Sequence, residues 1–307
     1  MKCIESLEDI KLNNTVVTIG KFDGLHKGHG KLLNVMKEKA EGRPTAILTF
    51  AVKPIDIINN SKSGMLVTEQ EKRLLCEAKG VDYYLSLPLT REFLDLTPEA
   101  FIKDVLIDIL DVSLIVCGPD FSFGRFGAGN VELLTKMSKY YGYQVIVVEK
   151  EKYQNQDIGS TGIRKKISDG EIELANEMLG HPFSVIGRVE EGKKLGRTLG
   201  LPTANLIPDK SKILPPKGVY RTKLLAGGET FDTISNVGIN PTVETNDIIK
   251  IETHILDGEA ELYDEIVEVQ FFEYIRPEKK FENVEALKAQ VEKDIEKVKN
   301  KQKSLAQ

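Results

Sequence analysis

The sequence predicts an α/β protein with two domains: a doubly wound parallel sheet, and after it a β-barrel with a C-terminal helix. The length of 307 residues favours two domains. Predicted strands and helices alternate as far as His181-Pro182, which is typical of a parallel sheet, whereas the following sequence predicts short strands punctuated by glycine and proline. We therefore expect one domain over residues 1–182 and the other over residues 183–307.

Short apolar runs rich in β-branched residues predict the strands of the first domain. They cover residues 15–19, 45–50, 83–87, 113–117 and 144–148. Apolar residues at helical spacing predict helices after His29, over residues 69–79, from Thr97-Pro98 to Leu110, and over residues 130–141. In the helix over residues 69–79 the apolar positions are Leu74, Leu75 and Ala78.

The second domain shows a different pattern of short strands, which is typical of a barrel. The predicted strands cover residues 185–189, 220–225, 230–237, 250–256 and 266–274, and Gly227-Gly228 predicts a hairpin turn. A helix is expected from about residue 283, with an apolar stripe formed by Val284, Leu287, Val291, Ile295 and Val298. We expect this stripe to pack against the barrel, because a coiled coil needs more clear heptads.

Composition and charge limit the classes of function. A net charge of −5 argues against a general binder of nucleic acid or membrane surfaces, which needs clustered cationic charge. Three widely spaced cysteines form neither a disulfide framework nor a metal-ligand pattern. The first residues lack the apolar core of a signal peptide and no run reaches membrane-spanning length, so the expected compartment is the cytoplasm. Any self-association is expected to be weak.

The residues with the clearest chemistry form a turn at positions 20–29, here called the histidine turn. His26 and His29 flank Gly28 between a predicted strand and a predicted helix. Such a turn directs backbone N–H groups and the positive end of a helix dipole towards a bound phosphate, to which both imidazoles can donate. Two ordinary surface histidines are the alternative for this motif alone. The turn is not a P-loop. The spacing from Gly24 to Gly30-Lys31 is one residue too long for that motif, and Leu32 stands where the motif requires Ser or Thr.

Other unusual loops follow strands of the first domain, where ligands bind in such sheets. Asp120, Phe121 and Phe123 lie in one loop, which we call the aromatic loop (residues 118–127). Ser160 and Thr161 begin a predicted helix, and Arg164 lies one turn later, so these residues can hold phosphates. Helix capping is the alternative role of Ser160 and Thr161.

In the second domain, a glycine-rich cationic loop precedes two oxygen-bearing side chains. The loop contains Gly192, Lys193, Gly196, Arg197 and Gly200 and suits phosphate groups. Thr203 and Asn205 follow it, and their oxygen atoms are hard ligands that suit Mg²⁺.

Two motifs resemble known families. The His26-x-Gly28-His29 motif resembles the signature of the nucleotidylyltransferase superfamily, which binds ATP on a Rossmann-like sheet. Residues 202–205, Pro-Thr-Ala-Asn, resemble a signature of riboflavin kinases, as do the segments 235–238, 251–254 and 275–281. Over about residues 1–300 the chain is similar to the bifunctional riboflavin kinase/FMN adenylyltransferases, the prokaryotic FAD synthetase family.

The resemblance implies two reactions that use ATP and Mg²⁺. The barrel would phosphorylate riboflavin to FMN, and the first domain would transfer AMP from a second ATP to FMN, which gives FAD and pyrophosphate. Glu252 matches the general base of the kinase, with His254 on the same strand face as an orienting or packing residue. The phosphate- or ATP-binding matches are Gly20, Phe22, Asp23, Gly28, Ser160, Thr161, Arg164, Gly192, Lys193, Gly196, Arg197, Gly200 and Asn236. His26 and His29 match the catalytic histidines, Asp120, Phe121, Phe123 and Arg276 the flavin-binding residues, and Thr203 and Asn205 the metal ligands.

The departures from the family pattern that touch known functional positions lie in the first domain. Lys21 stands where asparagine is usual, Lys53 replaces a histidine, and Gly159 replaces a serine. Two alternatives therefore stay open: a riboflavin kinase whose first domain no longer transfers AMP, and a regulatory protein that senses flavins.

Overall fold

The structure, a computed structural model, describes residues 1–8, 10–50, 64–190, 203–239, 249–256, 258 and 260–305. Packing divides this described chain into two compact units, Met1–Ser160 and Thr161–Gln307. The domain boundary expected after residue 182 stays a prediction.

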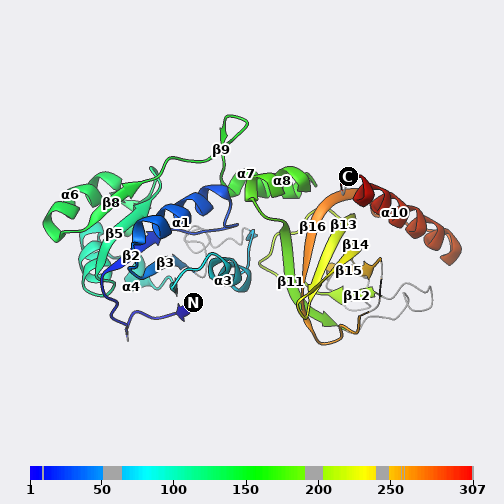
Figure 1. Ribbon diagram of the computed structural model, residues 1–307, viewed down its shortest axis with the longest axis horizontal. Helices are drawn as coiled ribbons and strands as arrows, with labels where there is room; N and C mark the ends of the chain where they lie inside the picture. Colours follow the sequence, from blue (N-terminus) through cyan, green and yellow to red (C-terminus); the bar gives the residue numbers. More distant parts are fainter. Residues whose placement is uncertain are drawn as a thin grey trace. The chain divides into compact units, whose positions relative to one another are not determined.

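A parallel sheet forms the centre of the first unit. Six strands of the described part lie in the order β1-β4-β3-β2-β5-β8, and every neighbouring pair is parallel. Figure 1 labels β3, β2, β5 and β8 of this order. The strands are β1 (Lys2–Ile4), β2 (Thr15–Ile19), β3 (Thr45–Phe50), β4 (Tyr83–Leu87), β5 (Val112–Cys117) and β8 (Gln144–Val147). The parallel sheet predicted from the sequence is therefore confirmed, and β1 is an additional edge strand.

Helices cover both faces of this sheet because alternate strand residues point to opposite sides. On one face, α1 (Lys27–Ala40) and α3 (Glu69–Ala78) pack Met36 and Cys76 against Val16, Ile47 and Tyr84. On the other face, the π-helix η1 (Phe101–Ile107) and α6 (Val131–Tyr141) cover the adjacent strand residues, which include Val17, Leu48 and Leu85.

Short elements complete the first unit, and α7 and α8 continue the chain into the second. Thr97 caps α5 by accepting the backbone N–H of Ala100 at 3.2 Å, as its sequence position predicts. The short elements are α4 (Arg91–Leu94), α5 (Pro98–Ala100), β6 (Ser122–Phe123), η2 (Arg125–Gly127), β7 (Gly129–Asn130), β9 (Lys152–Tyr153) and β10 (Gln156–Asp157). The two helices are α7 (Ser160–Ser168) and α8 (Ile172–Leu179).

Helix α3 is confirmed, but its buried face differs from the expected one. Leu74 is 48% exposed and Ala78 is also exposed, whereas Lys72 is only 3% exposed. Cys76 and Glu71 are buried beside it. The reason is a set of polar partners for the buried charges, which a pattern of apolar residues does not reveal.

The order of the strands places a topological switch point at β2. From β2 the chain continues to β3 and β4 on one side of the sheet, and then to β5 and β8 on the other. Ligands of such sheets bind at the carboxyl ends of the strands beside this point. The loops that leave the neighbouring strands β2 and β5 there are the histidine turn and the aromatic loop.

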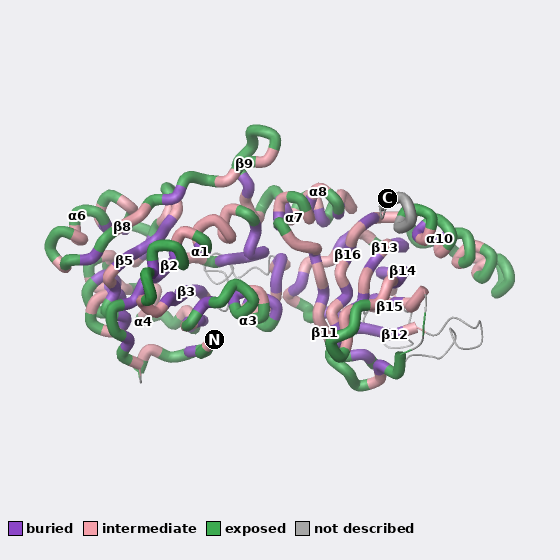
Figure 2. The backbone as a smooth tube through the Cα atoms, viewed as in Figure 1, coloured by how far each residue is buried: buried purple, intermediate pink, exposed green. Residues whose placement is uncertain are grey.

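A closed antiparallel barrel forms the second unit. Six of its described strands close in the order β11-β12-β15-β14-β13-β16. They are β11 (Phe183–Glu190), β12 (Thr203–Leu206), β13 (Gly218–Ala226), β14 (Glu229–Ile239), β15 (Ile249–Ile255) and β16 (Ile266–Pro277). Buried and more exposed residues alternate along β13 and β16 (Figure 2). The predicted barrel and its Gly227-Gly228 hairpin are confirmed.

The helix α10 (Val284–Leu305) packs against the outside of this barrel through Ile295 and Val298 of the predicted stripe, whereas Val284, at its start, is 55% exposed. Val298 lies in a small core with Val219 and Ile234. Asp294 is almost fully buried and accepts from the Arg276 guanidinium at 2.7 and 2.8 Å. Within the described residues, no helix has both the length and the apolar character of a membrane span.

The ion pair between Arg276 and Asp294 should be a main anchor of α10. In the Asp294→Asn variant the guanidinium loses its carboxylate in a site where the Arg276 side chain is only 19% exposed. We expect the free energy of unfolding of the second unit to fall by about 3 kcal/mol. Urea denaturation followed by circular dichroism measures it. The control is Asp169→Asn, whose ion pair with Lys165 lies at the surface and should contribute little; equal losses in both variants would contradict the prediction.

Candidate functional sites

The histidine turn is the first candidate site, and it follows the fully buried strand β2. His26 is the N-cap residue of α1, and its Nδ1 accepts the backbone N–H of His29 at 3.4 Å. A neutral imidazole that accepts at Nδ1 carries its proton on Nε2, so His26 retains an Nε2–H donor. A Cβ atom at Gly28 would lie only 3.2 Å from the His26 ring, which explains glycine there. The turn therefore combines a helix N-terminus with an imidazole donor, which suits a phosphate.

The two imidazoles of the turn lie against each other. The ring centroids of His26 and His29 are 3.7 Å apart with an interplanar angle of 20°. Burial lowers the pKa of His29 well below the usual range, and the charges of His26 and Lys72 lower it further. Among the described residues, Nδ1 of His29 is buried and has no hydrogen-bond partner. The neutral ring is therefore the expected state at neutral pH.

Neighbouring segments fix the turn. The ring of Phe22, a residue with a positive φ of 47°, lies 5.0 Å from that of His29. The Asp23 carboxylate accepts the backbone N–H of Leu66 at 2.8 Å, and the Ser160 hydroxyl donates to the Asp23 carbonyl at 2.7 Å. The structure thus brings Gly20, Phe22, Asp23 and Ser160 to the two histidines. Thr161 and Arg164 follow in the first turns of α7, within the second compact unit.

The aromatic loop is tied down at both its acidic and its aromatic residues. Lys150 lies 3.0 Å from the Asp120 carboxylate. The rings of Phe121 and Phe123 stack with centroids 5.5 Å apart. Phe123 is buried against Phe101 in the core, whereas Phe121 is partly exposed. Of this aromatic pair, Phe121 is therefore the ring that is more accessible to a ligand.

The second candidate site lies on the barrel. Pairing of β12 with β15 and of β15 with β14 places Asn205, Glu252 and Asn236 directly beside one another in one row. Directly paired residues point to the same face of a sheet, so their side chains share one surface. The next residue, Thr253, points inside the barrel, where its hydroxyl is 2.8 Å from that of Ser235. Glu252 consequently points away from the interior.

More of the predicted residues lie around this row. Thr203 pairs with His254, two residues along from the pair of Asn205 and Glu252, and therefore shares their face. A Cβ atom at Gly238 would collide with the Glu278 carboxylate and crowd the Asn236 amide, so glycine lets Glu278 lie over β14. Arg276, at the end of β16, is held by Asp294 instead of projecting freely.

Several predicted positions lie outside the described residues. They are Gly192, Lys193, Gly196, Arg197 and Gly200 of the glycine-rich loop, together with Lys53.

Both halves of the chain match models of known families. The FAD synthetase model matches residues 8–162, and the riboflavin kinase model matches residues 179–302. A bifunctional riboflavin kinase/FMN adenylyltransferase of Listeria monocytogenes is 38% identical over 92% of this chain and 90% of its own. The chain belongs to this bifunctional family.

Other relatives agree over nearly the whole chain. The bifunctional enzyme of Escherichia coli K12 is 35% identical over 95% of this chain and 94% of its own. The bifunctional enzyme of Buchnera aphidicola subsp. Schizaphis graminum is 37% identical over 97% of this chain and 98% of its own. A solved structure described as a macrolide-efflux protein from Streptococcus pneumoniae is 29% identical, with a TM-score of 0.85 over 97% of this chain and 98% of its own. The family assignment therefore extends over both units.

Two residues beside these sites belong to none of the sequence assignments, Lys72 and Asp294, and Glu278 is included only as part of the segment 275–281. Lys72 could have been found, because it precedes Leu75 and Cys76 by three and four residues and so lies on the same helix face. Glu278 and Asp294 meet their partners only through the folded barrel. Their sequence neighbours give no signal of that contact.

The lowered pKa of His29 predicts an acid-sensitive first unit. In the unfolded chain a histidine binds its proton near pH 6.5, whereas folded His29 does not, so the unfolded state gains stability as the pH falls below about 6.5. Urea denaturation between about pH 7.5 and about pH 5.5 should therefore show a smaller loss of stability in His29→Gln than in the wild type. An identical loss in both proteins, or an NMR titration of His29 near pH 6.5, would contradict this assignment.

Proposed function

We propose that this protein makes FAD from riboflavin in two steps. The barrel unit transfers the γ-phosphate of ATP to riboflavin and forms FMN. The parallel-sheet unit then transfers AMP from a second ATP to FMN and releases pyrophosphate. The observation that carries the proposal is that models of the two activities match successive halves of one chain, whose relatives are bifunctional over more than 90% of both lengths.

In the kinase unit, Glu252 is the proposed general base. Its carboxylate faces out of the barrel in a row with Asn205 and Asn236, where it can accept the proton of the ribityl 5′-hydroxyl as that oxygen attacks phosphorus. His254, on the same face, is placed to orient Glu252 or to pack beside it. Asn236 and the loop residues Gly192, Lys193, Gly196, Arg197 and Gly200 are proposed to hold ATP. Arg276 is proposed to bind the flavin, with Asp294 fixing its guanidinium.

Mg²⁺ is the metal that the proposed reaction needs, and the donor set of β12 fits it. Thr203 and Asn205 alternate along the strand, so a hydroxyl and an amide oxygen share the face of Glu252. These two residues are proposed to hold the ion together with phosphate oxygens of ATP. When bound, the ion neutralises charge on the transferred phosphoryl group.

In the adenylyltransferase unit, His26 and His29 are proposed to donate to the α-phosphate as negative charge grows on it. Gly20, Phe22, Asp23 and Gly28 shape the turn around the nucleotide. Ser160, in the same unit, is proposed to hold phosphate from the start of α7. Thr161 and Arg164, where the second compact unit begins, are proposed as further phosphate-binding residues on the family resemblance. Asp120, Phe121 and Phe123 are proposed to border the flavin, for which the partly exposed Phe121 supplies a stacking face.

The expected ligands are small molecules: ATP, riboflavin, FMN and FAD. Free cysteines at positions 3, 76 and 117 support a reducing compartment, which we infer to be the cytoplasm. Self-association is proposed to be weak.

A separation assay tests the two activities independently. With riboflavin, excess ATP and Mg²⁺, we expect FMN to appear first and FAD afterwards, and FMN as the starting flavin should give FAD directly. Accumulation of FMN without FAD would mean that Lys21, Lys53 and Gly159 mark an inactive first unit. Flavin binding without any turnover would favour the sensing protein instead.

Glu252→Gln should separate the two units within one chain. Loss of the base is expected to slow the conversion of riboflavin to FMN by about 10²- to 10⁴-fold, while FMN is still converted to FAD at the wild-type rate. Both rates are measured on the same preparation, so the second rate is the folding control. Unchanged phosphorylation of riboflavin would show that Glu252 is not the base.

A further inference from the structure

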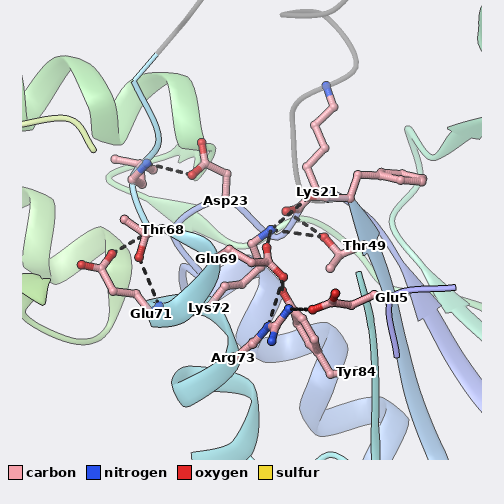
Figure 3. Close-up of polar contacts among 12 residues, drawn as sticks. Glu5, Lys21, Asp23, Thr49, Thr68, Glu69, Glu71, Lys72, Arg73 and Tyr84 are labelled. Atoms are coloured by element: carbon pink, nitrogen blue, oxygen red, sulfur yellow. Dashed lines mark hydrogen bonds and ion pairs between the residues drawn. The ribbon is translucent and has the colours of Figure 1, made fainter. Parts of the chain in front are cut away.

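Lys72 on α3 is a buried cation close to the histidine turn. Its side chain is only 4% exposed. Among the described residues, its Nζ lies 3.5 Å from Thr49 Oγ1 and 3.5 Å from Glu69 Oε2 (Figure 3). The Phe50 carbonyl oxygen lies 3.4 Å from the same Nζ. The ammonium group donates to the Thr49 and Phe50 oxygens, and it forms an ion pair with Glu69. Lys72 therefore joins α3 to the carboxyl end of β3.

The contact continues from β3 to the turn itself. The Thr49 hydroxyl, which accepts from Lys72, donates to the carbonyl oxygen of Lys21 at 3.2 Å. Lys21 is the second residue of the histidine turn. The segment before α3 makes a second link, because the Asp23 carboxylate accepts the Leu66 backbone N–H. Helix α3 thus contacts the turn at Lys21 through Lys72 and Thr49, and the segment before the helix contacts it at Asp23 through the Leu66 backbone N–H.

Glu69 supplies the negative charge that a buried ammonium needs. Burial alone would raise the pKa of Glu69, but the charges of Lys72 and Arg73 and the hydrogen bond from Tyr84 lower it. The Tyr84 hydroxyl donates to Glu69 Oε1 at 2.9 Å (Figure 3). Glu69 therefore stays ionised at neutral pH and balances the charge of the buried Lys72 side chain.

We propose that Lys72 is a positioning residue for adenylyl transfer, which holds the end of β3 and the histidine turn in the geometry that the α-phosphate requires. This inference rests on the function proposed for the first unit. Because the ammonium is covered by protein, it acts through Thr49, Lys21 and its field at the turn and not by contact with substrate. Among the described residues, the groups whose charge acts on His29 are His26, which is stacked on it, and Lys72.

The test compares Lys72→Met with Arg73→Met in the full-length chain. Arg73 is a matched control, because it lies next along α3 and also pairs with Glu69 at 3.5 Å. Among the described residues, however, it contacts Glu69, Glu5 and Tyr84 and not β3. Lys72→Met should lower kcat for the conversion of FMN to FAD by about 10- to 100-fold, with KM for ATP nearly unchanged. Arg73→Met should keep the wild-type kcat. In both variants, phosphorylation of riboflavin by the barrel unit should be unchanged.

Two further measurements distinguish positioning from simple stabilisation. Lys72→Arg should recover much of the lost kcat, and NMR titration should place the pKa of His29 higher in Lys72→Met than in the wild type. If Lys72→Met fails to fold, the double variant Glu69→Gln/Lys72→Met removes both charges and takes its place. Wild-type kcat together with an unchanged His29 titration would overturn the proposal, as would equal losses of kcat in Lys72→Met and Arg73→Met.

The same set of measurements tests this inference separately from the proposed function. Absence of FAD formation by the wild-type protein would refute adenylyl transfer by the first unit. The His29 titration would still show whether Lys72 acts on the turn, since it requires no turnover.

Discussion

The backbone pairing of strands positions both candidate sites. In the parallel sheet, the register of β2 with β5 brings the histidine turn and the aromatic loop to one edge beside the switch point. In the barrel, the register of β12, β15 and β14 sets Asn205, Glu252 and Asn236 side by side. A shift of one residue would send Glu252 into the interior and Thr253 out of it. The hydroxyl contact of Thr253 with Ser235 inside the barrel opposes that shift.

Much of this architecture follows from local sequence, and the exceptions have a common cause. Strands β2, β3 and β4 have the predicted bounds, because buried parallel strands are short continuous apolar runs. Strand β12 is missing from the prediction, because its four residues have no alternating pattern and their strand conformation depends on pairing with β15. The buried face of α3 is also misplaced, since the partners of Lys72 come from strands distant in sequence.

In the candidate sites, too, the position of a residue along the chain could be predicted from local sequence, whereas its contacts could not. The sequence places His26 and His29 at a strand-to-helix turn, and the structure agrees, with the difference that α1 already begins at Lys27 and includes His29. Neither the stacking of the two rings nor the use of His26 Nδ1 as the helix cap can be derived from motif spacing. Both depend on Phe22, Asp23 and Gly28, which hold the turn closed.

The choice of a lysine at position 72 has a physical consequence beyond stability. An apolar side chain of similar volume could join α3 to β3 at least as favourably, because burying an ion pair costs about as much as it returns. What an apolar side chain cannot supply is a fixed positive charge near His29. That charge opposes protonation of an imidazole already stacked on another, so the ring keeps one nitrogen as a donor and the other as an acceptor. A neutral donor in a fixed position can stabilise growing phosphate charge, which is the role proposed for this turn in adenylyl transfer.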